Sequence, residues 1–224
     1  AGSLIDVSLL RTELREIDEA LNKYGADTLN RLHGKFGMEN VWMYSNSELE
    51  TLIALERGDP AKIEWLQKGD VTVVFTDARN DYNGALVYSN HFTKDTGRTI
   101  RFELSGPGDI YRRMIFLGKL GIKPATFVHD AHGFPGFARA GVVKDSDGHV
   151  RTAYIAAFEA DDETRIPIMK TQFGRLVRDY MQPNRGVDSD NENIGKKQII
   201  LASCSGDVPY EYEGQEYYSI AEAV

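Results

Sequence analysis

Two short segments of the chain place reactive side chains directly after an apolar run. Residues 125–133 have the sequence Ala-Thr-Phe-Val-His-Asp-Ala-His-Gly, which contains His129 and His132, and residues 198–206 end in Ala-Ser-Cys-Ser-Gly, which contains Cys204. A thiol attacks as its thiolate, which a neighbouring imidazole can generate or stabilise. If the two apolar runs are adjacent strands, a histidine and the cysteine would meet where the strands end. This spacing therefore indicates a nucleophilic thiol and its base.

The residues around these side chains suit acyl chemistry. Gly133 follows His132, so its backbone N–H could face a developing oxyanion, and the N–H of Cys204 could be a second donor. Small neighbours such as Ala202 leave room for a substrate chain. The structural alternative is that Cys204 is a small buried apolar side chain and that the histidines only support the fold.

The elements that must position these groups follow from hydrophobic periodicity. Continuous apolar runs predict strands buried on both faces at 71–75, 125–129 and 198–202, and alternation predicts a half-buried strand at 99–104. Helices are predicted at 110–120, ended by Gly121, and at 166–181, and a hairpin turn is predicted at 145–148. Alternating strands and helices predict an α/β fold with a mostly parallel sheet, which places chemistry at the carboxyl ends of its strands.

The N-terminal third has a different pattern. Its periodicity predicts a helix over 4–35 that is interrupted at Gly25, a helix over 46–55 capped by Ser45 or Ser47, and a helix that begins at Pro60. It carries no chemical constellation. We therefore expect residues 1–69 to be a helical arm or linker and residues 70–224 to be the core domain.

Composition excludes several classes of protein. The single cysteine excludes a disulfide scaffold and a thiolate zinc module, and it favours a compartment in which thiols stay free. The formal net charge of −8 argues against a nucleic-acid binder. No apolar stretch is long enough to span a membrane, and we expect no signal peptide.

At this point the chain resembles a known family. An apolar block followed by His132-Gly133, and a second followed by Ala202-Ser203-Cys204-Ser205-Gly206, are similar to the caspase-like cysteine peptidases, which include caspases, clostripain-like and gingipain-like enzymes, and the self-processing protease domains of bacterial toxins. The resemblance covers roughly residues 70–224. It implies a three-layer sandwich of a mostly parallel sheet between helices, with His132 as general base, Cys204 as nucleophile, and the amides of Gly133 and Cys204 as the oxyanion hole. His129 is the competing base, and it is not followed by glycine.

The resemblance also implies what surrounds the dyad. Arg79, Asp207 and Ala202 fall where family members bind the substrate side chain, although Arg79 and Asp207 also suit solvated loop charges. The loop that contains Asp188, Asp190 and Glu192 has the alternating oxygen ligands of a calcium site, but it lacks the turn glycine and the distal glutamate, so a solvated loop is the simpler interpretation and no cofactor is expected. The fold has further strands after the cysteine, so residues 205–224 would leave it short, and we expect a module of a larger protein.

Three functions compete. The first is a cysteine endopeptidase that cleaves a polypeptide substrate, with its own parent chain as one candidate partner and self-processing as one mode of action. The second is a catalytically silent caspase-like module for binding or assembly. The third, an unrelated hydrolase or nucleotide-binding domain, lacks a Gly-rich phosphate loop and a Gly-x-Ser-x-Gly elbow. A free thiol suits both the cytoplasm and delivery into a target cell.

Overall fold

The computed structural model describes twelve segments of the chain, and the account below concerns these alone. They are residues 7–76, 98–104, 108–131, 133–134, 137–144, 146–156, 158–160, 165–167, 179–185, 195–202, 210–212 and 215–217.

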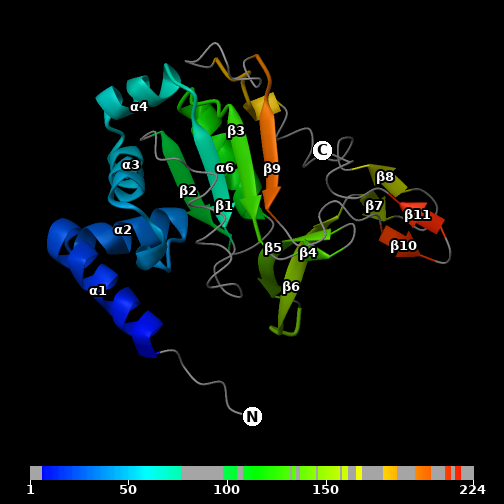
Figure 1. The fold of residues 1–224 in the computed structure, drawn as a ribbon, viewed down its shortest axis with the longest axis horizontal. Helices are drawn as coiled ribbons and strands as arrows, with labels where there is room; N and C mark the ends of the chain where they lie inside the picture. Colours follow the sequence, from blue (N-terminus) through cyan, green and yellow to red (C-terminus); the bar gives the residue numbers. More distant parts are fainter. Residues whose placement is uncertain are drawn as a thin grey trace.

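A four-stranded parallel sheet forms the centre of the molecule (Figure 1). Its strands lie in the order β2-β1-β3-β9, with bounds Thr99–Glu103, Thr72–Thr76, Thr126–Asp130 and Gln198–Ala202 respectively. All three strand pairs are parallel. The predicted α/β fold with a parallel sheet is therefore confirmed at this level, and the strands start within one residue of their predicted positions.

Strand β2 differs from its prediction. The alternation of residues 99–104 predicted one solvated face, but all five residues of β2 are buried. The cause is that the polar side chains of Arg101 and Glu103 meet polar partners from the N-terminal helical segment instead of water. A polar residue in a strand indicates solvent only when no other element covers it.

The N-terminal segment forms helices that lie beside the β2 edge of the sheet (Figure 1). They are α1 (Val7–Tyr24), α2 (Ala26–Phe36), the short 3₁₀ helix η1 (Val41–Met43), α3 (Asn46–Arg57) and α4 (Pro60–Gln67). The predicted break is confirmed at Gly25, whose φ is 81°. Of the two predicted caps, Ser45 is the one that caps α3.

One apolar core joins these helices to the sheet. Phe36 of α2 contacts Phe102 of β2 and Phe116 of α6 (Gly108–Lys119), with ring centroids 5.7 and 5.6 Å apart. Leu52 of α3 belongs to the same buried cluster as Phe127 of β3. The helices before residue 70 thus share their core with the strands after it.

Antiparallel strands follow β3 and β9. Strands β4 (Gly133–Phe134), β5 (Phe137–Lys144) and β6 (Val150–Ala156) form a three-stranded sheet, and β7 (Phe158–Ala160) pairs with β8 (Arg165–Pro167), as β10 (Tyr210–Tyr212) does with β11 (Gln215–Tyr217). The predicted hairpin at 145–148 is confirmed, because Lys144 is the register partner of Val150. The start of the helix predicted at 166–181 is wrong, since Ile166 pairs with Glu159 in a strand.

A glycine in α6 allows a close approach of Tyr180. A Cβ on Gly118 would lie 2.4 Å from the Tyr180 ring, whereas a Cβ on Gly34 of α2 would meet nothing within 4 Å. We expect Gly118→Ala to lower the free energy of unfolding by about 1–2 kcal/mol, because overpacking outweighs the gain in helix propensity. The matched change Gly34→Ala should instead raise it by about 0.5–1 kcal/mol. Urea unfolding of both variants checks this, and a stabilised Gly118→Ala variant would contradict the packing at Tyr180.

Candidate functional site

The carboxyl edge of the parallel sheet is the candidate site. Glu103, Thr76, Asp130 and Ala202 are the last residues of their strands, and they form one row of register partners across the sheet. Because all four strands are parallel, the chain leaves each of them at the same edge. Figure 1 shows these carboxyl ends pointing toward the sheet β4-β5-β6. Adjacent strands lie about 4.8 Å apart, so segments that follow β3 and β9 start close together.

Two of the predicted site residues belong to strands of the structure, and the others lie outside the described residues. Gly133 is the first residue of β4 and the register partner of Ala138, and Ala202 is the last residue of β9. The other candidates lie outside the described residues: His132, Cys204, Arg79, Asp207, Asp188, Asp190 and Glu192.

The competing base, His129, is an interior residue of β3. Its side chain is 1% exposed, and it is the register partner of Phe75 and Leu201. Successive side chains of a strand point to opposite faces, so His129 shares the face of Phe127, which packs against Phe75 at 5.3 Å between ring centroids. Asp130 lies on the other face. His129 is thus held on the aromatic side of the sheet, inside the core.

The opposite face of the sheet carries a buried ion pair. Arg101 of β2 and Glu48 of α3 have side chains that are 2% and 5% exposed. The Arg101 Nη2 donates to Glu48 Oε1 at 3.0 Å, and its Nε lies 3.3 and 3.2 Å from the two carboxylate oxygens. The remaining branch, Nη1, donates to the hydroxyl of Thr76 at 3.2 Å. A fork of donors meeting a carboxylate in this way gives a strong and directional contact.

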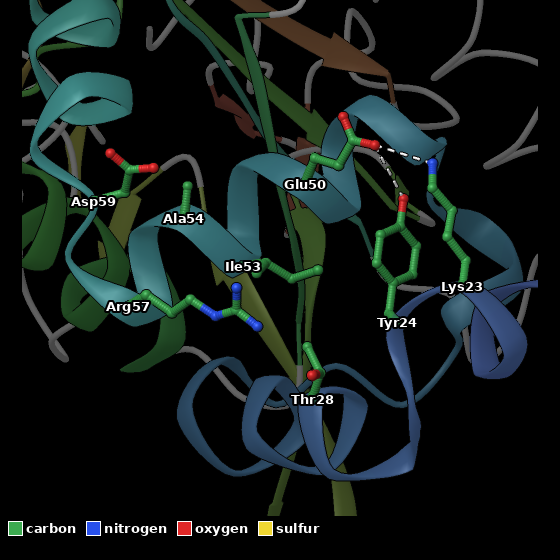
Figure 2. A pocket seen from close by; sticks show the side chains of 8 residues that line it. All are labelled: Lys23, Tyr24, Thr28, Glu50, Ile53, Ala54, Arg57 and Asp59. Carbon is green, nitrogen blue, oxygen red and sulfur yellow. Dashed lines mark hydrogen bonds and ion pairs between the residues drawn. The ribbon is translucent and has the colours of Figure 1, made fainter.

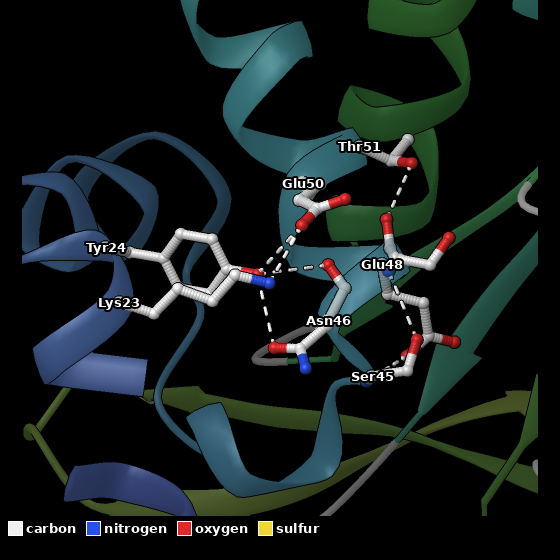
Figure 3. A network of polar contacts seen from close by, with 8 residues as sticks. Lys23, Tyr24, Ser45, Asn46, Glu48, Glu50 and Thr51 are labelled. Carbon is white, nitrogen blue, oxygen red and sulfur yellow. Dashed lines mark hydrogen bonds and ion pairs between the residues drawn. The ribbon is translucent and has the colours of Figure 1, made fainter. Parts of the chain in front are cut away.

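Glu48 also closes the N-terminus of α3. Its carboxylate accepts from the backbone N–H of Ser45 at 2.9 Å, and the Ser45 hydroxyl accepts from the N–H of Glu48 at 3.2 Å, which is a capping box. Figure 3 shows this box beside a second, exposed group in which Lys23 and Tyr24 of α1 reach Glu50. One carboxylate therefore serves both a helix cap and a buried cation.

A second buried carboxylate lies at the end of β2. Glu103 accepts from the backbone N–H groups of Glu39 and Asn40 at 3.1 and 2.8 Å and from the Asn40 side chain at 2.8 Å. Burial raises the pKa of Glu103 above its ordinary value, and the hydrogen bonds from Asn40 oppose that shift. Burial is the largest cause that raises the pKa of Tyr44 well above its ordinary value, and the negative charge of Glu103 is the second. The phenol therefore stays protonated.

This shift predicts how stability depends on pH. Since the folded pKa of Glu103 is above the unfolded value near 4.5, the folded chain binds this proton more tightly. The stabilisation from this proton is fully present below the unfolded pKa, and it is lost as pH rises through the folded pKa. We expect the wild-type free energy of unfolding, minus that of Glu103→Gln, to fall as pH rises in this window. Urea titrations of both chains at several pH values test this, and a difference that is constant with pH would contradict it.

None of these carboxylate contacts was predicted from the sequence. Ser45 was one of the two predicted caps, and the Ser-x-x-Glu pattern at 45–48 could also have indicated the reciprocal hydrogen bond to Glu48. The ion pair could not, because Glu48 and Arg101 are distant in sequence and only the packing of α3 on β2 joins them.

A hollow among the described residues lies away from the sheet edge. It has a volume of about 370 Å³ and opens between α1, α2 and α3, with Lys23, Glu50 and Arg57 among its lining side chains (Figure 2). Lys23 and Glu50 pair with each other across it at 3.0 Å, so these two charges neutralise one another. Ile53 and Ala54 also line it.

Within the described segments, no group of three or more His, Cys, Asp or Glu side chains is arranged to hold a metal ion. In the same segments no helix combines the length and apolar character needed to cross a membrane.

Comparison with known proteins gave no relative: no protein-family model, curated protein or solved structure matches this chain.

Proposed function

We propose that this protein is a cysteine endopeptidase of the caspase-like kind, in which His132 and Cys204 act as a dyad. One observation carries the proposal: β3 and β9 are adjacent and parallel, and their last residues, Asp130 and Ala202, are register partners. His132 and Cys204 each follow those partners by two residues. Both reactive side chains therefore belong to segments that leave neighbouring strands at the same edge, which is where parallel sheets place their chemistry.

The burial of His129 supports His132 as the base. Within β3, His129 lies on the face opposite to that of Asp130. Its imidazole is held in the aromatic core, where a peptide substrate would have no access.

The chemistry that follows from these roles is peptide hydrolysis in two steps. The Cys204 thiolate attacks the scissile carbonyl carbon, and the oxyanion that forms accepts hydrogen bonds from the amides of Gly133 and Cys204. The His132 imidazolium gives its proton to the leaving amine as the C–N bond breaks. Water, deprotonated by the neutral imidazole, then hydrolyses the thioester and releases the acid and the thiol.

The finer features belong to the same proposal. They are the three-layer sandwich of this family, a polypeptide substrate bound near Arg79, Asp207 and Ala202, action on the parent chain, and a compartment in which thiols remain reduced. What supports them is the resemblance of the residues around His132 and Cys204, together with the parallel sheet that both segments leave at one edge.

Alkylation of the single thiol tests the dyad without a substrate. We expect the rate of Cys204 alkylation by iodoacetamide to follow a pH profile with its midpoint well below about 8.5, the ordinary pKa of a thiol. In His132→Ala the midpoint should return to about 8.5, while His149→Ala, which removes an exposed histidine, should leave it unchanged. A wild-type midpoint at the ordinary value would contradict the proposal and favour a catalytically silent module for binding or assembly.

A further inference from the structure

A chain of buried contacts runs from α3 to the end of the central strand β1. Glu48 holds Arg101, and Arg101 donates through Nη1 to the Thr76 hydroxyl at 3.2 Å. Thr76 is fully buried and is the last residue of β1. Its backbone carbonyl also accepts from the N–H of Leu104 at 2.8 Å. The end of β1 is thus held by both its side chain and its backbone.

The donor that reaches Thr76 has a fixed position. Three of the four contacts of Arg101 go to the Glu48 carboxylate, which the capping box itself fixes at the start of α3. The guanidinium is planar, so once two of its nitrogens are set, the direction of Nη1 is set as well. The hydroxyl of Thr76 therefore meets a donor whose place depends on α3 and not on β1.

The place where β1 ends is the place where a ligand is expected. In the order β2-β1-β3-β9, strand β2, which follows β1 in the chain, lies on one side of β1. Strand β9, which follows β3, lies on the opposite side of β3. The topological switch point therefore lies between β1 and β3. Open parallel sheets bind ligands in the crevice outside the carboxyl ends of the strands at such a point. Thr76 and Asp130 are the register partners that border it.

From this geometry we infer that Thr76, held by Arg101 and Glu48, is a positioning residue for substrate binding. It keeps the carboxyl end of β1 in register beside β3, and the N-terminal helix α3 is thereby part of the binding unit and not a separable arm. The inference rests on the proposed peptidase function. It assigns Thr76 no contact with the reacting atoms.

Thr76→Val and Thr76→Ser form a matched pair for the test. Valine has nearly the shape of threonine but no acceptor for Arg101, whereas serine keeps the hydroxyl. The probe is the fluorogenic peptide that the wild-type chain cleaves fastest in a library varied before the scissile bond. We expect Thr76→Val to raise KM about tenfold with kcat within about twofold, because a small misplacement of binding groups weakens binding in the ground and transition states alike. Thr76→Ser should restore KM.

The same variants distinguish positioning from loss of structure. A merely structural role would reduce the folded fraction, which lowers the apparent kcat and leaves KM unchanged, and that result would overturn the inference. As a second readout, hydrogen exchange of residues 72–76 and 99–104 should quicken in Thr76→Val and return to the wild-type rate in Thr76→Ser. Unchanged exchange in Thr76→Val would also overturn it.

Failure of the proposed function would look different. If cleavage by the wild-type chain does not depend on Cys204, the peptidase proposal fails, and substrate positioning fails with it. The exchange data would then still decide whether Thr76 transmits the constraint from α3 to the end of β1.

Discussion

Cys204→Ala is expected to abolish peptide cleavage, with kcat/KM lower by roughly 10⁴-fold or more, because removal of an attacking nucleophile leaves only binding and the oxyanion donors. The chain has no second thiol that could take over the role. His132→Ala should cost about as much, since residues that act as a unit lose nearly the same activity when either is removed. Cleavage of a fluorogenic peptide library by each variant is the measurement.

His129 provides the control. Because its side chain is buried among aromatic rings of the core, we expect His129→Gln to lower the melting temperature rather than kcat/KM measured where the variant is folded. Circular dichroism spectra of all three variants show whether they fold. If His129→Gln abolishes cleavage in a folded chain while His132→Ala does not, the assignment of the base is wrong.

The strands were predictable because their signal is local. Continuous apolar runs at 125–129 and 198–202 lie within one residue of β3 and β9. All five residues of β3 are buried, as its run predicted, whereas residues 198–201 of β9 are only partly buried, so the prediction of a fully buried strand is wrong there. The pairing of β3 with β9 was not predictable, because it depends on contacts between residues about 70 positions apart. That pairing is nevertheless what places the segments of His132 and Cys204 at one edge.

Burial of charge was the harder feature to predict. In the sequence, Arg101 and Glu103 alternate with Ile100 and Phe102, which is the pattern of a strand with one solvent-exposed face. The same pattern arises when polar partners replace water, as Glu48 and Asn40 do here. Sequence periodicity measures polarity and not solvent exposure, so it cannot separate the two cases.

The second large effect is expected at the buried ion pair. Glu48→Ala should lower the free energy of unfolding by about 3–5 kcal/mol, because it leaves the Arg101 guanidinium buried without its counter-charge. Loss of the capping box accounts for about 1 kcal/mol of that change. Urea unfolding of the wild-type chain and the variant gives the difference.

Glu50→Ala is a matched control on the same helix. Glu50 pairs with Lys23 at 3.0 Å, but the two side chains are 57% and 47% exposed. Water screens an exposed pair, so this change should cost less than about 1 kcal/mol. Equal losses in Glu48→Ala and Glu50→Ala would contradict a role for burial and would point instead to a general effect of removing acidic side chains from α3.

Replacing both partners separates two free energies: the cost of leaving one buried charge unpaired, and the net contribution of the ion pair to stability. In the double variant Glu48→Met, Arg101→Met, apolar side chains fill the space and no buried charge remains, so we expect stability within about 1–2 kcal/mol of wild type even though each contact is gone. The Thr76 hydroxyl would still lose its donor in this variant. A chain that regains stability but keeps a raised KM would therefore separate the two roles of the pair: Glu48 neutralises Arg101, and Arg101 fixes the end of β1.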